Sequence, residues 1–169
     1  MSRIMIIILT ATITAAALFI IIMKLINKDG RYQTKYDERQ LIARGKAYMY
    51  GFVGIMLANV VMMILTSQTS FERLFSNIGY FIPIFVGIIV QISFSIFSDS
   101  YIGLNTNMKK YAIFMFIISL INIAIPLFFN ELIVDGVLQT SFINLCCGFL
   151  FLIVAVELLI KKMIDARED

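Results

Sequence analysis

Five long apolar segments alternate with short polar segments along the chain. They lie at about 4–23, 38–66, 78–97, 111–129 and 139–160. A helix needs about 20 predominantly apolar residues to cross the hydrocarbon core of a bilayer, and each segment is close to that length or longer. The remaining stretches are too short for a soluble domain. The pattern therefore predicts an all-α integral membrane bundle of five transmembrane helices, forming a single domain over residues 1–169.

The composition agrees with this pattern. Hydrophobic residues make up 60% of the chain and charged residues only 15%, whereas soluble domains carry about 25% charged residues. The first apolar run is followed by basic residues and preceded by only Arg3, so we expect a retained first helix and not a cleaved signal peptide. The expected location is the cell membrane, with a multi-pass topology.

The longest charged segment, residues 24–46, reads KLINKDGRYQTKYDERQLIARGK and holds seven of the fourteen Lys and Arg residues. With the segment 98–110 and the tail after Ile160 it accounts for twelve, leaving only Arg3 and Arg73 for the other side. Basic residues near span ends favour the cytoplasm. We therefore expect a cytoplasmic loop at 24–46, an outside N-terminus and a cytoplasmic C-terminus. Anionic lipid is an expected partner at that face, and nucleic acid is not.

The second helix has a clear start within this loop. Asp37 is placed to cap a helix that begins at Glu38, and Gln40 completes a capping box. Neither Asp37 nor Glu38 has a basic residue three or four positions later on the helix, so the charges here need partners from elsewhere. We interpret this segment as a candidate face for docking a protein partner, formed by Asp37, Glu38, Arg39, Gln40 and Arg44.

The stretch Asp37-Glu38-Arg39-Gln40 carries a family resemblance. It resembles uncharacterised small bacterial integral-membrane proteins that have a D-E-R-Q stretch in a cytoplasmic loop just before a membrane helix. The resemblance implies a bacterial membrane setting and no particular mechanism.

Small residues recur at helical spacing in the second and third segments. The two stripes are Ala47, Gly51, Gly54 and Ala58, and then Gly79, Pro83, Gly87, Gln91 and Ser95. Such stripes let two membrane helices approach closely. They predict packing between helices of this chain, with a homo-oligomer as the alternative.

The two segments expected on the outer side carry local signals. Phe71, Leu74 and Phe75 surround Glu72 and Arg73 between residues 67 and 77, which predicts a short interfacial helix. Asp135-Gly136 predicts a turn between the fourth and fifth helices.

Each of the last four predicted helices carries an amide side chain within its apolar part. These are Asn59, Gln91, Asn122 and Asn144. They are candidates for a polar intramembrane cluster that binds a small neutral ligand, or they form hydrogen bonds between helices.

Glu157 is the ionisable residue inside a predicted span, and such residues are functional candidates. Lys161 follows four residues later, in the favourable order for a helical ion pair. Two interpretations remain: a pair of Glu157 with Lys161 at the interface, or a proton or cation site.

The chain offers no recognisable catalytic machinery. It contains no histidine and no Walker A or GxGxxG sequence, and the adjacent Cys146 and Cys147 point about 100° apart on a helix. We therefore expect no enzyme activity, no cofactor and no metal site. The first functional hypothesis is a non-enzymatic membrane protein that acts through a partner docked at the DERQ segment. The alternative is a small-solute transporter, or a membrane subunit of one, with a polar site between helices two to five.

Overall fold

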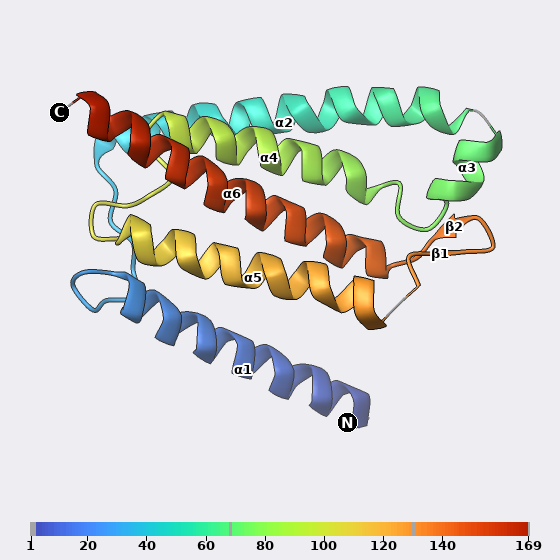
Figure 1. The fold of residues 1–169 in the computed structure, drawn as a ribbon, viewed down its shortest axis with the longest axis horizontal. Coiled ribbons are helices and arrows are strands. Elements are labelled where there is room, and N and C mark those ends of the chain that lie inside the picture. Colours follow the sequence, from blue (N-terminus) through green and yellow to red (C-terminus); the bar gives the residue numbers. More distant parts are fainter. Residues whose placement is uncertain (1–2, 68, 130, 169) are drawn as a thin grey trace.

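The computed structural model describes residues 3–67, 69–129 and 131–168, and the chain is a bundle of long helices (Figure 1). The elements in chain order are α1 (Arg3–Ile26), α2 (Glu38–Thr66), α3 (Thr69–Phe75), α4 (Phe81–Phe97), α5 (Met108–Phe129), β1 (Ile133–Val134), β2 (Val137–Leu138) and α6 (Ser141–Glu168). The prediction of a helical bundle is confirmed.

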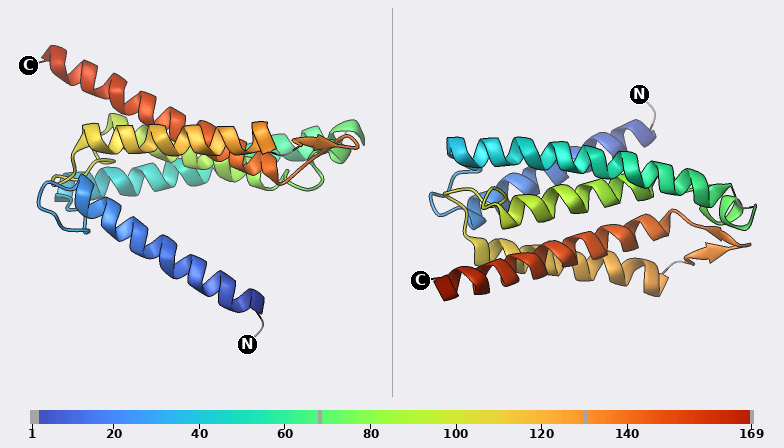
Figure 2. Two further views of the ribbon diagram at one scale, coloured as in Figure 1. Left: turned by 60° about the horizontal axis from the view of Figure 1, so that its bottom comes forward. Right: turned by 90° about the horizontal axis from the view of Figure 1, so that it is seen from above.

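The long helices run antiparallel to their neighbours in the chain, so the connections alternate between two ends (Figure 1). Helices α2, α4, α5 and α6 pack together. Near its C-terminal end, helix α1 meets the bundle through Met23 and Ile26, which are buried. Towards its N-terminus α1 diverges from the bundle (Figure 2).

Helix α2 begins where the sequence predicted. Asp37 Oδ1 accepts a hydrogen bond from Gln40 N at 2.7 Å, and Asp37 N donates to Gln40 Oε1 at 3.3 Å. This reciprocal pair is a capping box, which satisfies backbone N–H groups that the first helical turn leaves free. The predicted box is confirmed.

Helices α2 and α4 pack through the predicted small residues. A Cβ added to Gly51 would lie 3.0 Å from Gly87 O, and one added to Gly87 would lie 2.7 Å from Gly51 O. The two backbones are therefore too close to admit a side chain. Ala47, Pro83 and Ser95 on the same stripes are buried. The predicted packing within the chain is confirmed for this pair of helices.

Helices α5 and α6 make a second close contact at Gly148. A Cβ there would lie 2.6 Å from Ile123 Cγ1, and buried Ser119 donates its hydroxyl to Gly148 O at 2.8 Å. Closer to the other end of these helices, an apolar core joins α4, α5 and α6. It is formed by Ile96, Ala112, Met115, Leu150, Val154, Ala155 and Leu158.

Both local signals at the α2–α4 and α5–α6 connections are confirmed. Helix α3 covers Thr69–Phe75. Asp135 and Gly136 have positive φ angles of 51° and 76° and close a hairpin between β1 and β2. Consecutive left-handed residues suit the tight turn of a two-residue hairpin. The strands themselves were not predicted.

The helix limits differ from the predicted spans most clearly at the C-terminus. The predicted fifth helix ended at Ile160, whereas α6 continues to Glu168. The sequence after Ile160 contains no proline or glycine, and Lys161 pairs with Asp165 one turn later at 2.6 Å, so nothing terminates the helix. The other bounds shift by about one turn or less, which is common at helix ends.

Three helices within the described residues are long and apolar enough to cross a membrane: Glu38–Thr66, Met108–Phe128 and Ser141–Arg167. Two further apolar helices, Ala16–Ile26 and Phe81–Phe97, are shorter. The bundle therefore has the apolar helices of a membrane protein.

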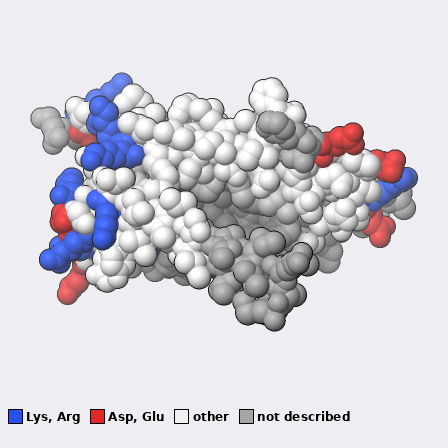
Figure 3. Space-filling model, turned by 90° about the horizontal axis from the view of Figure 1, so that it is seen from below, with Lys and Arg blue, Asp and Glu red and all other residues white. Residues whose placement is uncertain are grey.

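The charged side chains gather at the two ends of the bundle. Between the ends, the described part of the surface carries no Lys, Arg, Asp or Glu on the face shown in Figure 3. Basic residues dominate the end at which α2 begins and α6 ends. The opposite end carries Glu72, Arg73, Glu131 and Asp135. We call these the basic end and the acidic end.

Candidate functional site

Two loops pair with each other at the basic end. Loop 27–37 joins α1 to α2, and loop 98–107 joins α4 to α5. Their backbones are joined by hydrogen bonds from Lys28 N to Asn105 O at 2.6 Å and from Leu104 N to Lys35 O at 2.9 Å. The loops thus form one cap over the bundle.

Three polar side chains hold this cap together. Buried Asn105 accepts from Lys35 N at 2.9 Å through Oδ1 and donates to Gln33 O at 2.8 Å through Nδ2. Buried Thr106 donates to Asn27 Oδ1 at 2.8 Å. These bonds satisfy buried polar groups that would otherwise cost folding free energy.

Gly103 allows the closest approach of the two loops. A Cβ at Gly103 would lie 2.1 Å from Thr34 Cγ2 and 2.7 Å from Lys35 O. Because the second atom belongs to the backbone, a side chain could not be accommodated by a change of rotamer. A glycine is therefore required where the loops cross.

Asp29 forms a polar group at the outer side of the cap. Its carboxylate lies 3.1 Å from Lys35 Nζ and accepts from Asn105 Nδ2 at 3.1 Å. Partial burial raises the pKa of Asp29, but hydrogen bonds from Arg31 N, Lys35 and Asn105 outweigh that effect. The pKa of Asp29 is therefore below its ordinary value, because these donors stabilise the carboxylate.

Part of the DERQ segment is bound inside the protein. Gln40 is 8% exposed, and its Nε2 donates to Asp99 O at 2.7 Å and to Ile102 O at 3.1 Å. Gln40 therefore attaches the first turn of α2 to loop 98–107. The sequence left open what the DERQ segment contacts. For Gln40 the contact is with another loop of the same chain.

The charged residues beside Gln40 remain accessible. Arg39 lies 3.4 Å from Asp99 Oδ2, but its side chain is 78% exposed. Asp37 and Glu38 are also exposed. Exposed ion pairs contribute about 0–1 kcal/mol, so the contact with Asp99 leaves Arg39 free to exchange partners. The exposed docking candidates are thus Asp37, Glu38 and Arg39.

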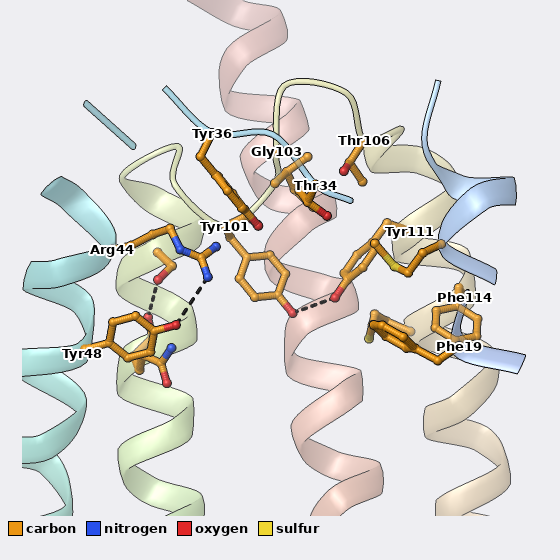
Figure 4. Close-up of a pocket in the computed structure, with 15 residues that line it drawn as sticks. Phe19, Thr34, Tyr36, Arg44, Tyr48, Tyr101, Gly103, Thr106, Tyr111 and Phe114 are labelled. Atoms are coloured by element: carbon orange, nitrogen blue, oxygen red, sulfur yellow. Dashed lines mark hydrogen bonds between the residues drawn. The ribbon is translucent and has the colours of Figure 1, made fainter. Parts of the chain in front are cut away.

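A cavity of about 230 Å³ lies beneath the cap (Figure 4). It is enclosed by α1, α2, α4, α5 and both loops. The lining residues are Phe19, Met23, Thr34, Tyr36, Arg44, Tyr48, Gln91, Ser95, Tyr101, Ile102, Gly103, Thr106, Tyr111, Phe114 and Met115. The lining combines aromatic rings, several hydroxyl groups and one guanidinium.

Arg44 is the charged group of this cavity. Its guanidinium lies over the Tyr36 ring, 4.2 Å from the ring centroid. It donates to Tyr48 OH at 3.3 Å and to Ser100 O at 3.4 Å, both long for N–H···O bonds. Within the described residues no carboxylate forms an ion pair with Arg44. The cavity therefore contains a half-buried cation whose charge is not compensated.

Tyr101 and Tyr111 face each other in the cavity, with their hydroxyl oxygens 3.2 Å apart (Figure 4). Burial raises the pKa of Tyr101, and the neighbouring Tyr111 adds to the shift. Burial disfavours the phenolate because it removes water from the charged form. Tyr101 is therefore a neutral hydroxyl that can donate a hydrogen bond.

The four predicted amides are not gathered in this cavity. Of the four, Gln91 lines it. Asn59 and Asn122 donate to carbonyls of their own helices, Ile55 O and Ile118 O, each at 2.9 Å. Asn59 and Asn144 are exposed on the surface of the bundle. The presence of an amide on each of these helices did not bring the residues together, because two of them lie on the outer surface of the bundle.

The predicted pair of Glu157 with Lys161 is not formed. Lys161 Nζ instead lies 2.9 Å from Asp99 Oδ1 and 2.6 Å from Asp165 Oδ1. The continuation of α6 supplies Asp165. Asp99, with a positive φ of 57°, directly follows the end of α4 and supplies the other carboxylate.

Glu157 itself faces α4. Its Oε1 accepts a hydrogen bond from Ser93 Oγ at 2.6 Å. Its Oε2 is buried and has no hydrogen-bond partner within the part of the chain that the structure describes. A proton or cation site at Glu157 stays a prediction.

Sequence reasoning missed most of the residues that build the site. Asn27, Tyr101, Gly103, Asn105 and Thr106 were not predicted to be site residues. The run Gly103 to Asn107 has the composition of a loop, but no feature of it indicates which loop it pairs with. No family model, curated protein or solved structure matches the chain.

The fold and the site together define a class of protein. It is a helical bundle with apolar helices suited to a membrane, and it carries a cavity with both apolar and polar lining residues under a hydrogen-bonded cap at its basic end.

Proposed function

We propose that the chain is a five-span protein of the cell membrane with its basic end in the cytoplasm. The basic end holds both cap loops and the C-terminal end of α6, and cytoplasmic ends of membrane proteins are enriched in Lys and Arg. The N-terminus then lies outside and the C-terminus inside. Helix α4 has 17 residues, which gives a length of about 25 Å at 1.5 Å per residue. This is slightly shorter than the hydrocarbon core of about 30 Å, and a bilayer accommodates such a small mismatch.

The function that the geometry supports best is binding of a small anionic molecule in the cavity, without catalysis. A protein of this kind is a solute carrier or a membrane subunit of one. The observation that carries the proposal is the uncompensated guanidinium of Arg44. A half-buried cation without a counter-ion is unfavourable, and an anion at Arg44 would remove that cost through charge-assisted hydrogen bonds.

The neighbouring groups suit the same ligand. Tyr48 and Tyr101 present hydroxyl donors to the cavity, and Gln91 presents an amide. Within the described lining no Asp or Glu would repel an anion. From the sequence we expected a neutral ligand bound by four intramembrane amides. We now propose an anionic ligand, and of the four amides Gln91 would contact it.

Thermal unfolding in a neutral detergent tests the proposal. A ligand that binds only the folded state at 100 times its Kd stabilises it by about 2.7 kcal/mol. Glycerol 3-phosphate should raise the melting temperature of the wild type, and glycerol should not. Arg44→Gln should lose the shift, whereas the exposed Arg39→Gln should keep it. Equal shifts in both variants would show that the anion binds elsewhere.

A second candidate function is docking of a cytoplasmic protein partner at the DERQ segment. It is favoured by the exposure of Glu38 and Arg39 beside the structured cap. A photoreactive residue at position 38 should give a discrete adduct in cells, and Arg39→Glu should abolish it without lowering stability. The same probe at exposed Lys162 is the control. An adduct that survives Arg39→Glu would count against this surface.

A further inference from the structure

We infer that the occupant of the cavity is an anionic phospholipid, whose phosphate headgroup binds Arg44 and whose acyl chains extend between α1 and the bundle. The inference rests on the proposed anion binding and adds the source of the anion. A soluble anion would need only the polar part of the cavity. A lipid would also use the apolar part of the lining, and this part therefore favours a lipid over a soluble anion.

The apolar side of the cavity lies next to α1, the helix that diverges from the bundle. Phe19 of α1 and Phe114 and Met115 of α5 line it on this side (Figure 4). Phe19 lines the cavity and yet is 60% exposed, so the cavity opens beside it. Because α1 leaves the bundle towards its N-terminus (Figure 2), this opening is towards the apolar middle of the molecule, where acyl chains lie.

In the proposed topology the polar groups lie near one end of the membrane spans, close to the depth of lipid headgroups. Arg44 is six residues beyond the start of α2 at Glu38, which is about 9 Å along the helix. Tyr48 follows one turn later, and Tyr111 lies in the first turn of α5. Tyrosine side chains are enriched at the membrane interface, where they combine apolar and polar contacts.

The size of the cavity favours a headgroup over a complete ligand. Pockets that enclose drug-sized molecules measure about 300–1,000 Å³, and this cavity measures about 230 Å³. A phosphate headgroup fits that volume, and the acyl chains must lie outside it.

An apolar groove beside the cavity offers a surface for those chains. It measures about 440 Å³ and is lined by Ile22, Leu25, Ile26, Lys110, Ile113, Phe114 and Ile117. Phe114 lines both spaces. Lys110, which donates to Leu25 O at 3.1 Å, adds a second cation near the basic end.

The absence of tryptophan from the sequence allows a site-specific fluorescence test on the full-length protein. Phe114→Trp places the single tryptophan of the variant between the cavity and the groove. The protein is reconstituted in bilayers that contain either brominated phosphatidylglycerol or brominated phosphatidylcholine, and quenching is compared. Phe149→Trp, at a position 51% exposed on α6, is the control for ordinary lipid contact.

In the Phe114→Trp variant, we expect quenching to give a relative affinity about fivefold higher for the anionic lipid than for the zwitterionic lipid. A preference of about fivefold corresponds to the attraction between one cation and an anionic lipid. The Phe149→Trp variant should show no preference. Adding Arg44→Gln should remove the preference at position 114, and adding Arg44→Lys should retain it. Gln91→Glu should also remove it, because it places a negative charge in the cavity while the contacts of Arg44 remain.

The outcomes separate this inference from the proposed function. If the Phe114→Trp variant shows no lipid preference but glycerol 3-phosphate still stabilises the wild type through Arg44, the cavity binds a soluble anion and the lipid inference is wrong. If neither effect depends on Arg44, both proposals fail. A preference that persists in Arg44→Gln and in Gln91→Glu would place the lipid outside the cavity and also refute the inference.

Discussion

The attachment of the DERQ segment to loop 98–107 makes Gln40 the most informative position for mutation. Gln40→Ala removes the donor to Asp99 O and Ile102 O and the acceptor for Asp37 N. Alanine favours the helix at least as well as glutamine, so the change isolates the side-chain contacts.

The magnitude follows from these three bonds. A typical intramolecular hydrogen bond contributes about 1 kcal/mol, and a buried group left without a partner costs about 1–3 kcal/mol. The two bonds of Nε2, at 2.7 and 3.1 Å, are well formed, whereas the 3.3 Å bond from Asp37 N is long. We expect Gln40→Ala to lower the free energy of unfolding by about 2–4 kcal/mol.

Two matched variants identify the cause. Gln40→Glu keeps a capping-box acceptor but turns a carboxylate towards two carbonyl oxygens, so it should destabilise at least as much as alanine. Arg39→Ala, one residue away with a side chain 78% exposed, should cost less than about 1 kcal/mol.

The assay is equilibrium unfolding of the purified protein in detergent. If Gln40→Glu is as stable as the wild type, Gln40 acts only as a helix cap. If Arg39→Ala is as destabilising as Gln40→Ala, the whole segment is a structural clamp, and docking through Arg39 loses its support.

Three further predictions follow from the contacts. Gly87→Ala should lower the free energy of unfolding by about 1–3 kcal/mol, because its Cβ would lie 2.2 Å from Ile55 Cγ1 and 2.7 Å from Gly51 O. Gly45→Ala, with nothing within 4 Å, should raise it by about 0.5–1 kcal/mol, and equal melting temperatures of the two variants would contradict the packing of α2 on α4. The topology can be tested with single cysteines in a variant with Cys146 and Cys147 replaced by serine. A membrane-impermeant thiol reagent added outside cells should label Ser70→Cys and Glu131→Cys but not Gln33→Cys or Lys109→Cys. Labelling of Gln33→Cys would show that the topology is the reverse of the one proposed. Because the pKa of Asp29 is lower in the folded state, its contribution to stability is present above the ordinary value of 3.8 and is lost as the pH falls below it. The melting temperature of Asp29→Asn should therefore fall less than that of the wild type between about pH 5 and pH 3, and identical slopes would refute this role.

The sequence by itself determined the apolar helices, the start of α2 and one of the turns. The apolar runs predicted five helices, the pair Asp37 and Gln40 predicted the start of α2, and Asp135-Gly136 predicted the hairpin turn. These features depend on residues a few positions apart, so local physical chemistry decides them. The small-residue stripes also predicted which faces of α2 and α4 pack against other helices, because helical spacing places such residues on one side.

Only the tertiary structure decided what those helices bring together. Gln40 bonds Asp99 across 59 residues and Asn105 bonds Lys35 across 70. Lys161 pairs with Asp99 and not with Glu157, although Glu157 is the nearer in sequence. Arg44 faces a cavity that four helices and two loops line. The order in which helices pack and the path of each connecting loop set these distances. The spacing of residues within one segment predicts neither the packing order nor the loop path. A helix fixes the directions of its own side chains but not which helix packs beside it.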